Sequence, residues 1–480
     1  MSTKRSPGQA LSRRRFVKMA GGATVAAAGM GVLPFKKLLG PFAMSEAEAQ
    51  TAYPAPNLFY AGTDGWISLP ASPAIVSASL GGVTTHPDPF APVPADGPGI
   101  PPGLTTYIFG FRNVTGLDDV QRGNQKNKAQ HNAPMFWVDQ FNPAAPKDFR
   151  IRLTNLGLAF RPDLFDAHTI HWHGFRNVLT FFDGEPTGSV AVTTGRFFEY
   201  IYRPRDPGTY MFHCHVEDTE HVHMGMTGPV FVRPLQNGQN IGGFTKFAYN
   251  DGDGSTGYHR EFVMFCSEVW GDSHWADAHI QLPEWSDYHA DFSLLNGRVY
   301  PDTLAPNGSI DPFNPVRDAD GDLIAPQPRT GEAAGIYDHL KYQPLSALVT
   351  CNAGDRVLLR FANLGFRESA MTLSGIKMRV VGKDATPMKG RDGTNSSYEA
   401  STVSFGAGES IDAIFSAPAF SGGSGSSGLG YDTYVLHDRA YERSNNLAAA
   451  TAGGTPYGGR RTEVRVYAAG TLGAQLIPNI

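Results

Sequence analysis

The chain has 480 residues, of which 41% are hydrophobic and 11% aromatic, so it is long enough for two or three domains with large cores. Its formal net charge is −5, and residues 1–49 hold eight of the 40 Lys and Arg and two of the 45 Asp and Glu. The remaining chain carries 32 basic and 43 acidic residues, a net charge of −11. A chain this acidic lacks the basic surface that nucleic acids and anionic membranes require, so neither is an expected partner.

The first 49 residues have the pattern of an export signal. Arg13–Arg15 precede a weakly apolar run from Met19 to Leu33, and Ala47–Ala49 offer a small-residue cleavage site. The segment resembles a twin-arginine signal peptide, which predicts a periplasmic or secreted protein. A membrane anchor is the alternative, but this run is too short and too rich in Gly and Ala to span a bilayer. We expect no membrane span elsewhere.

The periodic segments that follow are short and alternate between apolar and polar residues, as at 148–154 and 356–361. This alternation predicts strands, because successive side chains of a strand point to opposite faces. No window longer than about 12 residues keeps the apolar stripe that an amphipathic helix would show. The sequence therefore predicts an all-β class, with sandwiches or barrels as the architecture.

An internal repeat divides the chain. Residues 147–156 (KDFRIRLTNL) parallel residues 355–364 (DRVLLRFANL), and Gly208-Thr209-Tyr210 parallels Asp432-Thr433-Tyr434. The repeat predicts two related β domains, at 52–235 and 259–470, with a polar, Gly-rich linker at 236–258.

Seven of the 15 histidines gather in two clusters, and a cysteine lies in the second one. A cysteine flanked by two histidines and followed by further His and Met residues offers the soft sulfur and imidazole ligands that copper prefers. The clusters are His168, His171 and His173, and then His213, Cys214, His215, His221 and His223 with Met224 and Met226.

Strand geometry separates these ligands into two sites. If residues 213–215 are extended, Cys214 points away from His213 and His215, and His168 points away from His171 and His173. The first site holds two imidazoles, a thiolate and a weak axial thioether, which is the ligand set of blue copper: His168, Cys214, His221 and Met226. The second site is presented by His171, His173, His213 and His215.

The backbone at Cys214 joins the two predicted sites. This connection gives an electron a short path from the thiolate-bound, type 1 copper to the histidine-bound copper. We therefore expect a copper-dependent oxidoreductase.

The histidine spacing resembles the copper motifs of multicopper oxidases. His168-x2-His171-x-His173-Gly174, followed by the run from Gly208 to His215, carries the resemblance. It implies two cupredoxin-like Greek-key β-sandwiches and a type 2 or type 3 copper site that reduces dioxygen. The family's His-x4-Met interval also favours His221 and Met226 as ligands over His223 and Met224, and leaves His223 outside the ligand set or exposed.

The second domain departs from this pattern. A three-copper cluster of this family needs eight histidines and the first domain supplies four, whereas residues 368–374 (ESAMTLS) contain none. His437 stands where the second motif would place a histidine. Copper nitrite reductases, which are trimers of two-domain chains, hold one type 2 copper with three histidines, and His173, His213 and His437 match those positions. His171 and Ser374 depart from that second pattern.

Three functions follow as hypotheses: an oxidase that reduces dioxygen, a nitrite reductase-like enzyme, and a non-enzymatic electron carrier. The resemblance implies a homotrimer, in which the second domain of a neighbour closes the site. The electron donor is a small molecule such as a phenol, a metal ion such as manganese or cuprous ion, or a small redox protein.

Several residues outside the two sites carry weaker expectations. The acidic group in the copper loop is expected to be a solvated loop, with docking or proton supply as the alternative, and His86 and His131 are expected at the surface. Cys266 and Cys351 lie in strand-like runs, where they either form a disulfide or remain as two buried thiols. The acidic group comprises Glu217, Asp218 and Glu220.

Overall fold

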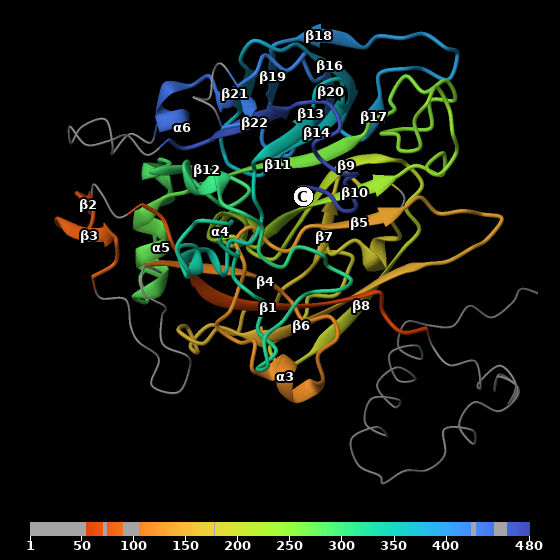
Figure 1. Cartoon of the computed structure of the whole chain (residues 1–480). Helices are drawn as coiled ribbons and strands as arrows, with labels where there is room; N and C mark the ends of the chain where they lie inside the picture. The colour runs from red at the N-terminus through yellow and green to blue at the C-terminus, as the bar shows by residue number, and fades with distance from the viewer. Residues whose placement is uncertain (1–53, 71–73, 90–104, 177, 424–428, 446–457) are drawn as a thin grey trace, which may run out of the picture. The chain divides into compact units, whose positions relative to one another are not determined.

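The computed structural model describes residues 54–70, 74–89, 105–176, 178–423, 429–445 and 458–480 (Figure 1). The export signal predicted at 1–49 lies outside these residues. Within the described ranges, no helix is both long and apolar enough to cross a membrane.

The first half of the described chain forms two facing four-stranded sheets. One has the order β4-β1-β6-β8 and the other β5-β10-β9-β7. Their aromatic and aliphatic side chains meet in a common core that includes Tyr60, Phe136 and Trp172. The strands are β1 (Leu58–Ile67), β4 (Thr106–Asn113), β5 (Phe136–Asp139), β6 (Phe149–Gly157), β7 (His171–His173), β8 (Phe197–Tyr202), β9 (Gly208–His213) and β10 (Thr227–Arg233).

The second half repeats this arrangement with its own core. One sheet has the order β12-β11-β14-β20-β16-β17, with β18 paired to β16, and the other has the order β13-β22-β21-β15-β19. The strands are β11 (Arg260–Val269), β12 (Phe292–Leu295), β13 (Val349–Asn352), β14 (Arg356–Asn363), β15 (Ser369–Leu373), β16 (Met378–Lys383), β17 (Thr386–Pro387), β18 (Tyr398–Ala400), β19 (Thr402–Phe405), β20 (Ser410–Ser416), β21 (Tyr431–Asp438) and β22 (Arg461–Tyr467).

The repeated sequence occupies equivalent central strands. β6 pairs in parallel with β1 and antiparallel with β8, and β14 pairs in parallel with β11 and antiparallel with β20. The predicted fold class, two cupredoxin-like β-sandwiches, is confirmed.

The two sandwiches share a buried interface. Met211 and Phe231 of the first pack with Val263 and Phe265 of the second, and Thr209 Oγ1 donates a hydrogen bond of 2.5 Å to Asp412. Residues Pro56–Ile480 form one compact unit. The domain boundaries at 235 and 259 therefore stay a prediction.

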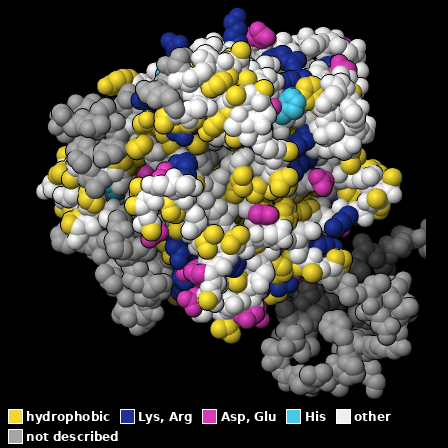
Figure 2. Space-filling view, in the orientation of Figure 1, with side chains coloured by type: hydrophobic (Ala, Val, Ile, Leu, Met, Phe, Trp, Pro, Cys, Tyr) yellow, Lys and Arg dark blue, Asp and Glu magenta, His cyan; other side chains and the backbone are white. Residues whose placement is uncertain are grey.

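Short helices lie between the strands. They are α3 (Asp119–Gly123), α4 (Asp218–Met224), α5 (Gly271–Ala278) and α6 (Tyr441–Asn445), and single 3-10 turns occur at Thr180–Phe182, Trp285–Asp287, Asp302–Leu304 and Asp338–Leu340. A short hairpin pairs β2 (Ile75–Ser77) with β3 (Val83–His86). On the face shown in Figure 2, acidic and basic side chains are interspersed and histidine covers only small areas.

The two cysteines of the second sandwich are buried free thiols. Cys266 and Cys351 both belong to its core, and burial raises the pKa of Cys266 to about 11. The disulfide alternative is therefore wrong and the buried-thiol alternative holds.

Candidate metal centres

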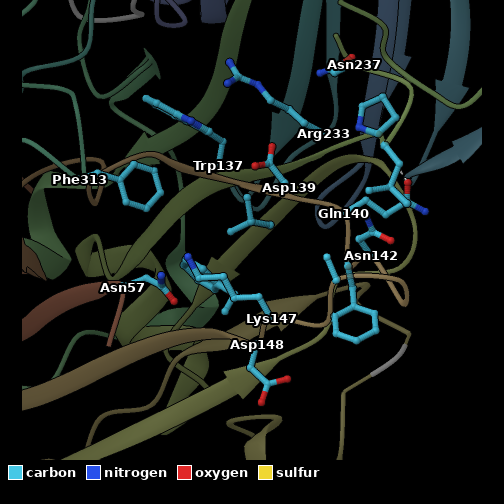
Figure 3. A pocket seen from close by; sticks show the side chains of 16 residues that line it. Asn57, Trp137, Asp139, Gln140, Asn142, Lys147, Asp148, Arg233, Asn237 and Phe313 are labelled. Carbon is cyan, nitrogen blue, oxygen red and sulfur yellow. Dashed lines mark hydrogen bonds between the residues drawn. The ribbon is translucent and has the colours of Figure 1, made fainter. Parts of the chain in front are cut away.

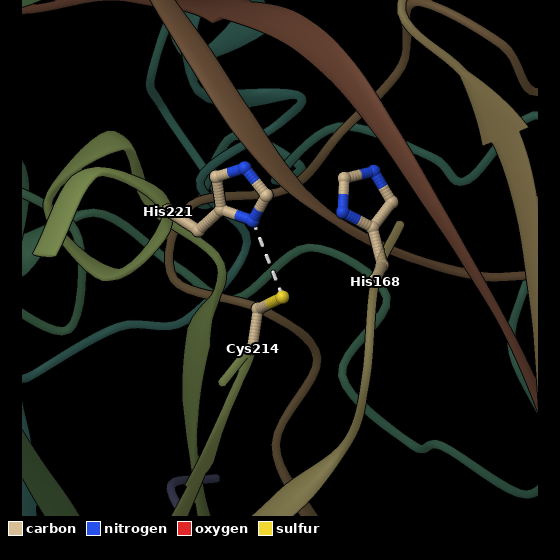
Figure 4. A group of neighbouring side chains, drawn as sticks. All are labelled: His168, Cys214 and His221. Carbon is tan, nitrogen blue, oxygen red and sulfur yellow. Dashed lines mark hydrogen bonds between the residues drawn. The ribbon is translucent and has the colours of Figure 1, made fainter. Parts of the chain in front are cut away.

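The predicted type 1 ligands converge in the core of the first sandwich. The Sγ atom of Cys214 lies 3.2 Å from Nδ1 of His221, and one ligand atom each from His168, Cys214 and His221 lie within 4.8 Å of one another (Figure 4). These three side chains and Met226 have no exposed surface. A metal bound here is shielded from water.

Backbone hydrogen bonds hold these ligands in place. Cys214, one residue beyond β9, donates its N–H to the carbonyl of Met226, and Met226 donates to the carbonyl of His221 at the end of α4. His168 exchanges two backbone hydrogen bonds with Val192. The site is thus fixed from three segments that are distant in sequence.

Gly62 of β1 makes room for the site. A Cβ atom at this position would lie 2.7 Å from Cδ2 of His168 and 3.4 Å from Cε of Met226. Glycine is required by this close approach, since any side chain would displace the imidazole. The same glycine therefore borders both His168 and the Met226 methyl group.

The electrostatics of the site suit a bound cation. Burial opposes ionisation of Cys214, but the neighbouring His221 and His168 hold the pKa of this thiol well below its usual range. Burial likewise opposes the charge on His221, but the Cys214 thiolate and Asp166 raise the His221 pKa to about 10. Thr169 donates its backbone N–H to the Cys214 sulfur at 3.5 Å. A thiolate is the form of cysteine that binds metals.

His168 provides the fit test for this site. Both of its ring nitrogens are buried and have no hydrogen-bond partner. An unpartnered buried nitrogen costs about 1–3 kcal/mol, so a ring with two of them calls for a ligand. With an adjacent thiolate, imidazole and thioether, that ligand is a soft or borderline metal ion such as copper.

The other predicted site lies on the opposite face of the same strands. β7 pairs with β9 so that His171 is opposite His213. The His171 ring centre lies 5.2 Å from that of His213 and 4.9 Å from that of His215, and Nδ1 of His173 lies 3.4 Å from Nε2 of His213. The structure therefore brings all four histidines together, and His171, His173 and His213 form a group with metal-ligand spacing.

Hydrogen bonds fix which ring nitrogen can bind a metal. Nδ1 of His171 donates to the carbonyl of Asp183 and Nδ1 of His213 donates to the carbonyl of Cys214, each at 2.8 Å. Since a carbonyl only accepts, the Nε2 atom of each ring carries the lone pair, and that of His213 lies 3.4 Å from Nδ1 of His173 within the histidine group. Burial, reinforced by the neighbouring imidazoles, lowers the His213 pKa to about 3, so this ring is neutral and can coordinate a metal at neutral pH.

His437 lies apart from both groups. In the second sandwich Thr372 is opposite His437, as His171 is opposite His213 in the first. His437 is thus the counterpart of His213, but it belongs to none of the three groups of residues with metal-ligand spacing found in the described chain.

The register reveals what replaces the type 1 ligands in the second sandwich. Asp438 donates its N–H to the carbonyl of Arg460 at 2.9 Å, as Cys214 does to Met226 at 3.0 Å. Ser369 lies three residues before Thr372, as His168 lies three before His171. The counterparts of His168, Cys214 and Met226 are therefore Ser369, Asp438 and Arg460.

A buried guanidinium group takes the place of a metal there. Nη1 of Arg460 donates to Ser369 Oγ at 2.6 Å and lies 3.6 Å from Asp438, and its Nη2 lies 3.3 Å from Glu268. All four side chains are buried. This arrangement supplies a fixed positive charge without a metal.

Some expectations about the surrounding residues were wrong. His86 and His131 were expected at the surface but are 1% exposed. For His223, which was expected outside the ligand set or exposed, only the exposed alternative is wrong: it is 4% exposed, with Nε2 accepting from the Trp270 N–H. The acidic group was expected to be a solvated loop; Glu217 and Asp218 are exposed, but Asp218 and Glu220 lie in the first turn of helix α4. Local polarity misled the prediction for the histidines because they pack against the second half of the chain.

Sequence reasoning missed one neighbour of the type 1 site. Asp166 Oδ2 lies 3.4 Å from Nε2 of His221, on the side of the ring away from Cys214. Asp166 precedes His168 by two residues, and this strand-like interval was a signal that the two share a face.

A hollow in the first sandwich is remote from the predicted copper ligands. It has a volume of about 590 Å³ and is lined by Trp137, Phe141 and Arg233 among others (Figure 3). β10 runs from Thr227, beside His213, to Arg233, so the hollow lies roughly 20 Å along the strand. No predicted site residue lines it.

Residues 151–237 match the family model described as multicopper oxidase. The predicted family resemblance is confirmed. The match spans the predicted ligands from His168 to Met226, and the metal implied for this multicopper oxidase-like segment is copper.

Solved structures give a broader likeness. A blue copper oxidase from Nitrosomonas europaea matches at 17% identity over 85% of each chain, with a TM-score of 0.48. The multicopper oxidase mgLAC matches at 19% identity over 87% of each chain, also with a TM-score of 0.48. A copper nitrite reductase from Nitrosomonas europaea matches at 13% identity over 88% of this chain and 96% of its own, with a TM-score of 0.47. No curated protein matches the chain.

Proposed function

We propose that the protein is a copper-dependent oxidoreductase of the multicopper oxidase type. The observation that carries the proposal is the run His213-Cys214-His215, whose cysteine faces the type 1 ligands while its histidines face His171 and His173. Copper at the first set would take single electrons from a donor, and copper at the second set would deliver them to dioxygen.

The two sets of ligands differ in how accessible they are to water and small molecules. The type 1 ligands are fully buried, so water is excluded and the donor remains outside the ligand shell. His171, His173 and His215 are half-buried, which leaves their site accessible to a small acceptor. Asp183 orients His171 through its backbone carbonyl. Phenols, manganese or cuprous ions, and small redox proteins remain the proposed donors.

Four histidines do not complete a three-copper cluster. A homotrimer in which another copy closes the histidine face is the proposed assembly, with the remaining ligands supplied across the interface. Sedimentation gives a direct test, because a monomer with full activity would contradict this assembly.

A nitrite reductase-like reaction is the second candidate, and His437 favours it. Nδ1 of His437 donates to the Asp438 carbonyl at 2.8 Å, as Nδ1 of His213 does to the Cys214 carbonyl, so the lone pair of His437 is on Nε2. Arg439 and Arg461 line the same pocket and oppose a second divalent cation there. We therefore rank this candidate below the oxidase.

Copper content and spectra test these functions. The copper-loaded protein is compared with Cys214→Ser and with the matched control Cys266→Ser, which alters a buried thiol outside the site. About four coppers per chain support the oxidase, about two support the nitrite reductase-like enzyme, and one indicates an electron carrier. Blue absorbance that persists in Cys214→Ser would overturn the assignment of the type 1 site.

Export by the twin-arginine route is also proposed, from Arg13–Arg15 and the apolar run that follows them. Replacement of all three arginines by lysine is expected to retain the protein in the cytoplasm. Cell fractionation measures this, and unchanged export would contradict the proposal.

A further inference from the structure

A surface pocket of about 440 Å³ lies on the outer sheet of the second sandwich. Ser374, His437, Arg439 and Arg461 are among its lining residues. Along β21, Leu436 and Asp438 are buried, while His437 is half-buried and the following Arg439 is exposed. This alternation directs His437 and Arg439 to the same outward face.

The two arginines of this pocket form no ion pair with a carboxylate among the residues that the structure describes, where no Asp or Glu lies within ion-pair distance of Arg439 or Arg461. The adjacent sequence 446–457 contains no acidic residue either. By contrast, the neighbouring Arg460 is paired with Asp438 and Glu268.

Arg461 is held in position without an ion pair. Its guanidinium group lies 4.6 Å from the centre of the Tyr300 ring, and its backbone pairs with His437 across the strands. Stacking of this kind orients the group while leaving its N–H donors available. An oriented arginine next to an exposed one is suited to binding an anion through several charge-assisted hydrogen bonds.

The pocket is the counterpart of the copper-binding histidine face. By register, Thr372 and Ser374 replace His171 and His173, and Arg439 lies two residues beyond His437, as His215 lies two beyond His213. Arg461 is opposite His437, where Thr227 is opposite His213. The first sandwich thus offers neutral nitrogen ligands to a cation on this face. The equivalent face of the second sandwich offers positive charge and hydrogen-bond donors.

We propose that this pocket binds a small oxyanion of the phosphate type. Arg439 and Arg461 donate to its oxygens, and Nε2 of His437 accepts from its hydroxyl group, since Nδ1 is already engaged with Asp438. Hydrogen phosphate offers both kinds of group. The inference does not rest on the oxidase reaction proposed above, whereas phosphate and a type 2 copper would compete for Nε2 of His437.

Isothermal titration of the copper-loaded, full-length protein with inorganic phosphate tests the site. Arg461→Gln and Arg439→Gln should each weaken binding roughly tenfold or more, because each removes a charged donor. Arg391→Gln, at an exposed position outside the pocket, is the control and should change binding less than about twofold. Arg461→Lys keeps the charge and the fold. It should lose part of the phosphate affinity, because the ammonium group cannot donate two parallel hydrogen bonds as the planar guanidinium group does.

Three outcomes would overturn the proposal. The first is that phosphate does not bind to the wild type, and the second is that the control loses as much affinity as the pocket variants. The third is that the pocket variants change the sedimenting species but not phosphate binding, which would assign the arginines to contacts with another copy of the chain.

Discussion

Replacing Arg460 by methionine should destabilise the second sandwich strongly. Methionine replaces the unbranched aliphatic stem of the arginine but not its charge. Asp438 and Glu268 are then buried without their cation, and Ser369 loses its hydrogen-bond donor. Breaking a buried ion pair by removing one partner costs about 3–5 kcal/mol. For a domain of about 200 residues, 1 kcal/mol corresponds to roughly 2–4 °C in Tm, so we expect a decrease of about 6–20 °C.

Differential scanning calorimetry of the copper-loaded protein measures this change. Arg391→Met, at an exposed position, is the matched control and should shift the Tm by less than about 2 °C. The double substitution Arg460→Met with Asp438→Asn should regain part of the loss, since it removes one stranded charge. A single Arg460→Met variant that unfolds within 2 °C of the wild type would refute the view that this guanidinium replaces a metal as the central charge.

Three further predictions concern the metal sites and acid stability. His171→Ala should lower the copper content per chain while the blue absorbance persists, because this ring serves the histidine face; loss of the blue band would contradict the separation of the sites. Met226→Leu should keep the blue absorbance and raise the reduction potential, since loss of the thioether weakens the oxidised copper more than the reduced; voltammetry measures it, and an unchanged potential would speak against an axial role. Burial of Glu261 opposes its charge, but Arg233 and Arg360 lower its pKa from 4.5 to about 2. Its charge therefore stabilises the fold fully above pH 4.5, and this stability is lost as the pH falls toward 2; Glu261→Gln should flatten that part of a Tm-against-pH curve.

Helix α4 shows where a local signal existed but was not used. Its first turn contains Asp218 and Glu220, and its last turn contains His221 and His223. Acidic residues in the first turn of a helix and basic residues in its last turn stabilise the helix, because their charges interact favourably with its dipole. The same segment was interpreted as a solvated loop because it lies where the family resemblance places the copper loop.

The sequence by itself determined how the copper ligands divide between two faces. His171 and His173 share a face and Cys214 opposes His213 because side chains of a strand alternate with a period of two, a property that neighbouring residues alone encode. Tertiary structure decided which distant residues meet: His221 with Asp166, and Arg460 with Ser369 and Asp438. Such contacts depend on how strands far apart in the chain pair and pack, and no spacing between neighbours specifies them. The second sandwich therefore kept the strands of its counterpart in the first, while packing placed a guanidinium where the first holds its metal ligands.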